Sequence, residues 1–156
     1  MSEQNSSKQL ATFFVDGDQF GIEVMRVQEV TGETRLFNVP LAPHLVRGLV
    51  NLRGQIATAI GLREAFSKAT VSKESQMSVV CKVDGMLISL IVDSIGDVVE
   101  VDGARFEPAP DTIPDEIKKY VKGIYKMDGV LLSVLDLDVI GKELSPVEIA
   151  SEQALI

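Results

Sequence analysis

Side chains that could act as nucleophiles or metal ligands are scarce in this chain, which has one cysteine and one histidine. A single cysteine excludes an internal disulfide and a cysteine-based zinc cluster, and a single histidine excludes a histidine pair on a metal. A Cys–His dyad stays open as the one nucleophile that would depend on histidine. However, Cys81 stands in the middle of a predicted strand, residues 79–83, where a small core residue is expected, and His44 follows Pro43 in a predicted solvated loop. We therefore predict no catalytic residue, no metal and no cofactor.

The acidic residues suggest two further kinds of site, a calcium loop or a pair of catalytic carboxylates. A calcium loop at Asp16, Asp18 and Glu23 lacks a third acidic position and the glycine that follows it. An aspartic-protease arrangement needs one carboxylate from each half of a duplicated chain. Asp93 is the nearest candidate, but its counterpart in the repeat described below is Met25, which cannot share a proton. We predict that the protein is not an enzyme, and a small β-barrel enzyme with a carboxylate site is the less favoured alternative.

The overall charge restricts the class of partner. Lys plus Arg number 15 and Asp plus Glu number 23, which gives a net charge of −8. Nucleic-acid binding relies on a basic surface, so no nucleic-acid partner is expected. Residues 1–9 are polar and lack the apolar core of a signal peptide, and no apolar stretch approaches the ~20 residues of a membrane-spanning helix. These features predict a cytoplasmic protein that does not insert into a membrane.

Two segments of the chain repeat one pattern of apolar residues and glycines. Residues 48–62 match 123–137 at an offset of 75, and residues 16–30 match 84–98 at an offset of 68. The matched pairs include Gly48/Gly123, Gly54/Gly129, Leu62/Leu137, Asp16/Asp84, Gly17/Gly85 and Val24/Val92. The difference between the offsets, 75 − 68 = 7 residues, falls in a longer connection that contains 107–114. The chain is therefore predicted to be an internal duplication of one unit of ~60 residues.

Each copy consists of short β-branched runs separated by turn residues, a pattern typical of strands joined by tight hairpins. The chain contains 20 Val and 12 Ile but no Trp. Predicted turns stand at Asp16-Gly17, Gly54, Asp84-Gly85 and Asp128-Gly129, because glycine accepts the positive φ of such turns. Frequent short strands predict an all-β fold of two small barrels in tandem, since closure removes free strand edges.

The predicted domain spans residues 10–140 and contains two barrel units, about 12–66 and 78–140, joined by an exposed polar link at 66–76. Residues 1–9 are expected to be a flexible N-terminus. A short helix is predicted to begin at Pro114, with acidic residues in its first turn. A C-terminal helix or tail is predicted at 145–156, where Ser145 and Glu148 form a capping box around Pro146.

Without an active site, the sequence favours a binding surface. Arg53 precedes a turn glycine, whereas the corresponding residue of the second copy is Asp128. Such a residue is either solvated or a guanidinium reserved for a partner's carboxylate or carbonyl oxygens. Val27 and Val98 have acidic neighbours, so each is either a core residue of a strand or part of an apolar groove with an acidic rim.

At these residues the chain resembles the CheW family, the coupling proteins of bacterial chemotaxis, over roughly residues 10–140. The resemblance depends on five segments: Phe20-Gly21-Ile22, Val27-Gln28-Glu29-Val30, the run 48–56 with Asn51-Leu52-Arg53-Gly54, 92–98 and Pro108-Ala109-Pro110. It implies two five-stranded, SH3-like β-barrels with short helices. It also implies a non-enzymatic adaptor that binds the cytoplasmic tip of chemoreceptors and the regulatory domain of the histidine kinase CheA, and so is recruited to receptor arrays at the membrane.

By motif match, the resemblance implies receptor contacts at Val27, Glu29, Gly48, Arg53 and Val98, and it leaves the kinase-binding residues unknown. The chain departs from the family at 57–63, where the usual Val-Pro-x-x-Asp-Leu-Arg lacks its proline and its aspartate. A divergent CheW-like scaffold of a non-flagellar chemosensory pathway is the alternative interpretation.

Overall fold

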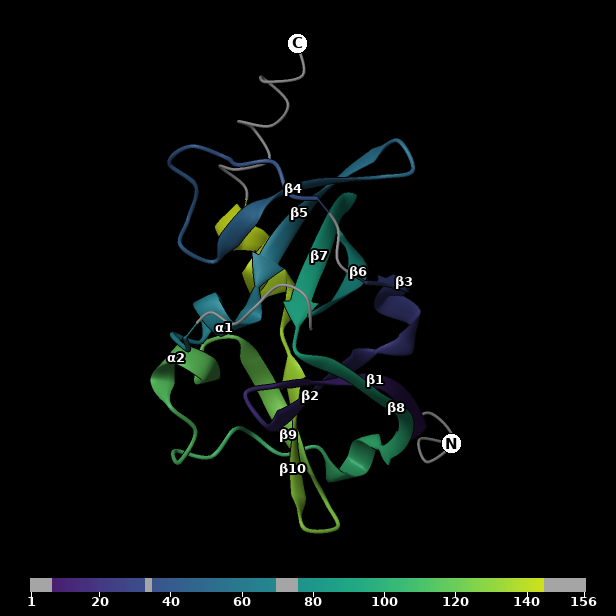
Figure 1. The fold of residues 1–156 in the computed structure, drawn as a ribbon. Coiled ribbons are helices and arrows are strands. Elements are labelled where there is room, and N and C mark those ends of the chain that lie inside the picture. Colours follow the sequence, from purple (N-terminus) through teal and green to yellow (C-terminus); the bar gives the residue numbers. More distant parts are fainter. Residues whose placement is uncertain (1–6, 33–34, 70–75, 145–156) are drawn as a thin grey trace.

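The structure, a computed structural model, describes residues 7–32, 35–69 and 76–144, and these residues form two five-stranded sheets (Figure 1). Sheet A has the order β8-β1-β2-β10-β9 and sheet B the order β3-β6-β7-β5-β4. The strands of sheet A are β1 Ser7–Val15, β2 Asp18–Glu23, β8 Ser94–Asp102, β9 Val121–Met127 and β10 Val130–Leu135. Those of sheet B are β3 Val27–Thr31, β4 Val46–Leu52, β5 Gln55–Gly61, β6 Met77–Val83 and β7 Met86–Val92. The predicted all-β fold with two five-stranded subdomains is confirmed.

The duplication is visible strand by strand. The first three strands correspond to β6, β7 and β8 at the offset of 68, and β4 and β5 correspond to β9 and β10 at the offset of 75. Replacing each strand by its counterpart converts the order of sheet A into the order of sheet B. Each sheet therefore combines the first hairpin of one copy with the last three strands of the other copy.

This exchange brings strands from different copies together in parallel pairs. Strand β10 runs parallel to β2 in sheet A, and β5 runs parallel to β7 in sheet B. The chain passes from sheet A to sheet B between β2 and β3, and it returns between β7 and β8. The sequential units 12–66 and 78–140 therefore do not coincide with the two sheets, and neither copy forms a complete sheet from its own strands.

Hairpin turns lie where the glycines predicted them. Asp16 and Gly17 have φ values of 51° and 83°, Asp84 and Gly85 have 49° and 80°, and Arg53-Gly54 repeats this pattern. Two successive positive φ angles match the twist of neighbouring antiparallel strands. Local turn chemistry therefore determines the register of three hairpins.

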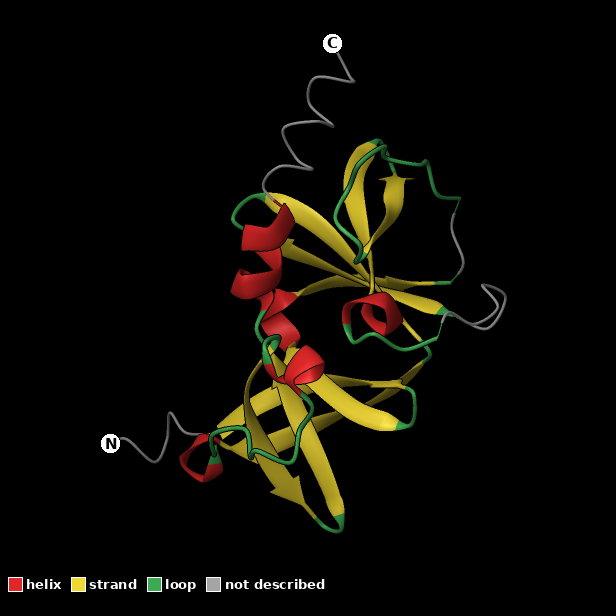
Figure 2. Cartoon of the chain, turned by 90° about the vertical axis from the view of Figure 1, so that its left-hand side faces the viewer, coloured by secondary structure: helices red, strands yellow, loops and turns green. Residues whose placement is uncertain are grey.

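Helical segments are short and lie mostly where the two sheets meet (Figure 2). They are α1 Leu62–Ala65, α2 Asp115–Lys118, the 3-10 turns Val24–Arg26 and Gly103–Arg105, and a helix over 137–144. The helix predicted at Pro114 is confirmed, with Pro114 as its N-cap residue. The helix 137–144 was not predicted, although Leu137, Ile140 and Leu144 have helical spacing and are buried.

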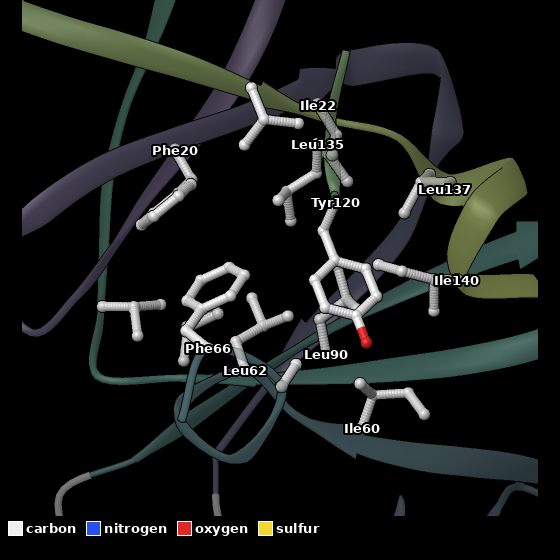
Figure 3. Close-up of a cluster of buried hydrophobic side chains, with 14 of the residues drawn as sticks. Phe20, Ile22, Ile60, Leu62, Phe66, Leu90, Tyr120, Leu135, Leu137 and Ile140 are labelled. Atoms are coloured by element: carbon white, nitrogen blue, oxygen red, sulfur yellow. The ribbon is translucent and has the colours of Figure 1, made fainter. Parts of the chain in front are cut away.

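The main hydrophobic core lies between the sheets and takes side chains from both (Figure 3). Phe20 from sheet A stacks on Phe66, with ring centroids 4.9 Å apart. Smaller clusters lie within each sheet, around Leu132 in sheet A and around Val80 in sheet B. Burial of these apolar surfaces is the main driving force that holds the sheets together.

Two boundary predictions differ from the structure. The link 66–76 was expected to be exposed, but Phe66 and Gln76 at its ends are buried, because Phe66 completes the core between the sheets. Residues 7–9 belong to the predicted flexible N-terminus, yet they pair with β8 as the start of β1. The capping box at Ser145 and Glu148 lies outside the described residues.

Candidate protein-interaction surface

Arg53 and Glu29 form an ion pair that joins the two outer strands of sheet B. Glu29 lies on β3, Arg53 lies in the β4–β5 turn, and these strands stand at opposite ends of the sheet order. Arg53 Nη1 is 3.2 Å from Glu29 Oε2, so the sheet curls until its ends meet. The Arg53 side chain is 85% exposed and that of Glu29 19%, which leaves most of the guanidinium available to a partner.

The backbone at Arg53 is unusual for its residue type. Its φ is +55°, a left-handed conformation that Asn, Asp and Gly adopt more readily than arginine. The Asn51 side chain supports the turn, because its Oδ1 accepts a hydrogen bond from the Gly54 amide at 2.9 Å. An arginine at this position is therefore not explained by the turn, which favours the interpretation that its side chain serves the surface.

Val27 is half-buried and packs against the main core. It pairs with Cys81 on β6, and a β-bulge separates it from Glu29. The exposed apolar residue of the same strand is Val30, at 45%. Of the two interpretations of Val27, the structure provides the core contact directly, and a groove contact could use only its exposed part.

Gly48 is buried and permits a close backbone approach. Its φ is +147°, and a β-carbon there would lie 2.6 Å from the carbonyl oxygen of Phe37. Because Gly48 has no side chain, Phe37 forms two 2.7 Å backbone hydrogen bonds with Leu49 at the edge of β4. Phe37 is 50% exposed, and the Arg35 guanidinium lies 5.3 Å from the centroid of its ring. No motif in the sequence indicates this exposed ring, and Gly48 positions it by allowing the close backbone approach.

Val98 lies on a different sheet from the other four candidate residues. It is on β8, an outer strand of sheet A, where it pairs with Ala11 and is 58% exposed. Its counterpart in the repeat is Val30 rather than Val27, from the offset of 68. A partner that contacts all five residues would therefore have to span both sheets.

The remaining chemical candidates are accounted for by local contacts. Cys81 is completely buried, and desolvation raises the pKa of its thiol to about 12. Asp93 accepts two hydrogen bonds from Arg63, at 2.8 and 2.7 Å, which hold the pKa of its carboxyl below the usual value.

Across 7–32, 35–69 and 76–144, no group of three or more His, Cys, Asp or Glu side chains could hold a metal ion. In those same ranges, no helix has the length and apolar character needed to cross a bilayer.

The segment 57–63, which departs from the family pattern, has the carboxylate of a different residue beside it. Gly61 is the N-cap residue of α1 and replaces the aspartate of that pattern. The Glu64 carboxylate occupies the space that a β-carbon at position 61 would need, and it pairs with Arg47 Nη1 at 3.3 Å. A carboxylate therefore lies near the start of α1 although the aspartate is absent.

Comparisons with known proteins agree on one family. A family model described as a CheW-like domain matches residues 9–144. The chain is 27% identical over 135 residues to the chemotaxis protein CheW of Rhizobium meliloti (strain 1021), covering 86% of this chain and 87% of that protein. It is 28% identical over 142 residues to the chemotaxis protein CheW of Treponema pallidum (strain Nichols), covering 88% and 84%. The crystal structure of the scaffolding protein TtCheW from Thermoanaerobacter tengcongensis matches with a TM-score of 0.73 and 27% identity, over 83% of this chain and 84% of that one. The chain therefore belongs to the family of CheW-like domain proteins.

Proposed function

We propose that this protein is a chemotaxis coupling adaptor that acts without catalysis. It binds the cytoplasmic tip of a chemoreceptor and the regulatory domain of the histidine kinase CheA, and it places the kinase under receptor control. The protein is cytoplasmic, and its receptors recruit it to arrays at the membrane. The observation that carries this proposal is the match over most of the chain, in sequence and in fold, to proteins named as chemotaxis CheW and as a scaffolding protein.

The receptor face includes the Arg53–Glu29 pair and the exposed part of Val27, with Gly48 in a supporting role. Arg53 offers a guanidinium that is 85% exposed and lies 3.2 Å from the Glu29 carboxylate. A planar guanidinium suits carboxylate and carbonyl acceptors on a helical partner. Val98 extends this face to sheet A through an apolar side chain at the outer strand β8.

The test titrates the purified protein with a receptor cytoplasmic fragment and, separately, with the CheA regulatory domain. Replacing Arg53→Ala should weaken receptor binding about 10- to 140-fold, because a charge-assisted hydrogen bond contributes ~1.5–3 kcal/mol. Asp128→Ala is the matched control, since Asp128 is the counterpart of Arg53 in the β9–β10 turn and is exposed. It should leave receptor affinity unchanged. Failure to bind either fragment would refute the adaptor function, and full receptor binding by Arg53→Ala would refute this receptor face.

A further inference from the structure

The chain crosses between the sheets at two equivalent places that differ in their side chains. The first crossing is the 3-10 turn Val24–Arg26, and the second is Asp93, where β7 passes directly into β8 (Figure 1). Met25 and Asp93 are counterparts at the offset of 68. The two crossings occupy corresponding places in the repeat, but the first makes a 3-10 turn and the second passes through a single residue, so they differ in backbone as well as in side chains.

At the second crossing, Asp93 is bound by groups from both sheets. Arg63, in α1 directly after β5 of sheet B, donates from Nε to Oδ1 at 2.8 Å and from Nη2 to Oδ2 at 2.7 Å. From sheet A, the Asp16 amide donates to Oδ2 at 2.7 Å, and the Phe14 carbonyl accepts from the Asp93 amide at 2.9 Å. The side chains of Arg63 and Asp93 are only 13% and 22% exposed.

Two further ion pairs strengthen this cluster. The Asp16 carboxylate lies 3.6 Å from Arg63 Nη2 and 3.3 Å from Lys68 Nζ. Arg63 also donates from Nη1 to the Ala69 carbonyl at 3.0 Å. The Arg63 guanidinium therefore uses all three of its nitrogens in a fixed arrangement that includes the β1–β2 turn, the β7–β8 crossing and the segment after α1.

At the first crossing, the counterpart of the cluster around Asp93 is a single weak ion pair. The counterpart of Arg63 at the offset of 75 is Asp138, which lies 3.8 Å from Arg26, with side chains 68% and 34% exposed. Met25 replaces Asp93 there and is 92% exposed. An exposed pair at this distance contributes little to stability.

Apolar contacts between the sheets are non-directional, whereas a bidentate guanidinium–carboxylate pair requires one geometry. We propose that Arg63, Asp93 and Asp16 form a one-sided clasp that fixes the orientation of sheet A relative to sheet B. Arg63 and Asp93 are then positioning residues for the receptor face, because that face combines Arg53 on sheet B with Val98 on sheet A. This second consequence rests on the proposed function, whereas the clasp itself does not.

The clasp is tested on the full chain alone, by electron–electron distance measurement between spin labels. Gln55→Cys on sheet B and Val130→Cys on sheet A are exposed counterparts, and buried Cys81 should remain unlabelled. Arg63→Met should broaden or shift the distance distribution. Arg63→Lys keeps the charge but cannot make the two parallel hydrogen bonds to Asp93, so it should also broaden or shift the distribution. Arg26→Met, the control at the other crossing, should keep the wild-type distribution.

A wild-type distribution in Arg63→Lys and Asp93→Asn would overturn the clasp. Protection of Cys81 from a thiol reagent, in the same chain without the added cysteines, confirms that each variant is folded. If Arg63→Met does not fold, these two milder variants decide the result.

The consequence for binding is measured with the receptor cytoplasmic fragment. Arg63→Lys should weaken binding by about 5-fold or more, the usual lower limit of coupling between sites, while Arg26→Met binds as the wild type does. An altered distance distribution with wild-type receptor affinity would overturn the positioning role alone. Failure of the wild-type protein to bind the receptor would refute the proposed function, and the distance measurement would still decide the clasp.

Discussion

Arg53 has the left-handed backbone that a tight hairpin normally assigns to Asn, Asp or Gly, with φ +55°. The side chain gains little in return from its pair with Glu29, because the guanidinium is 85% exposed and water screens the attraction. Arg53 is unfavourable for its turn and is only weakly stabilised by its ion pair with Glu29. Its presence is best explained by a contact outside the chain.

Arg53→Asn should therefore raise stability while it weakens receptor binding. Asn-Gly is a preferred pair for this turn, so we expect a gain of up to about 1 kcal/mol. In a domain of this size that gain raises Tm by about 2–4 °C, which a thermal unfolding curve resolves. A lower Tm would show that the Glu29 pair stabilises the fold by more than the turn gains from asparagine.

Gly48→Ala should destabilise the fold through the backbone of Phe37. The new β-carbon would lie 2.6 Å from the Phe37 carbonyl oxygen, at a φ of +147°. We expect a loss of about 2 kcal/mol or more in urea unfolding, since both strain and two backbone hydrogen bonds are affected. Gly32→Ala is the control, because a β-carbon at Gly32 meets nothing within 4 Å. Equal stability of the two variants would show that the Phe37 segment moves freely.

At the scale of the element, β3 is an outer strand whose inner side chains pack against the core. Val27 pairs with buried Cys81, so the thiol reports whether β3 stays attached to β6. The exposed face of the same strand carries Val30. The strand therefore offers a core position and a surface position for the same substitution.

Val27→Asp should lower stability by about 1–3 kcal/mol, because a carboxylate would lose water without gaining a partner. Detachment of β3 should also make Cys81 react with a thiol reagent faster than in the wild-type protein. Val30→Asp, at a position 45% exposed, should leave both Tm and Cys81 protection unchanged. Weaker receptor binding by Val27→Asp, with wild-type Tm and a protected thiol, would show that Val27 contributes to the receptor face alone and not to the core.

At the scale of the whole molecule, the stability that Asp93 contributes to the contact between the sheets should depend on pH. Hydrogen bonding to Arg63 lowers the pKa of Asp93 in the folded state, so the unfolded chain binds this proton more tightly. The resulting stability is present above the ordinary carboxylate pKa of ~3.9 and is lost as pH falls through the lower folded-state value.

The stability difference between wild type and Asp93→Asn should therefore be largest near neutral pH and should shrink as pH falls below about 4. Urea unfolding between pH 7 and pH 3 measures it. Asp138→Asn, which removes the exposed 3.8 Å pair with Arg26, should follow the wild-type curve at every pH. A constant difference for Asp93→Asn would contradict an ionic contribution from this carboxylate.

Local patterns in the sequence determined the hairpins, the duplication and the family of this protein. Runs of β-branched residues between Asp-Gly turns predicted the hairpins, since strand periodicity and positive φ are properties of neighbouring residues. The repeat offsets predicted the duplication, and the motif around Arg53 indicated the family to which the chain belongs. The same local signals also placed Cys81 in the core.

Only the tertiary structure decided how the two copies combine and what Asp93 does. Exchange of strands between the sheets depends on which edges meet after each crossing, and residues far apart in sequence determine those contacts. Asp93 and Met25 occupy equivalent places, but Arg63 and the β1–β2 turn converge only on Asp93. Pairings over 30 and 77 residues leave no periodic trace in a single sequence, because each partner satisfies its own local strand or turn pattern whether or not the other is present.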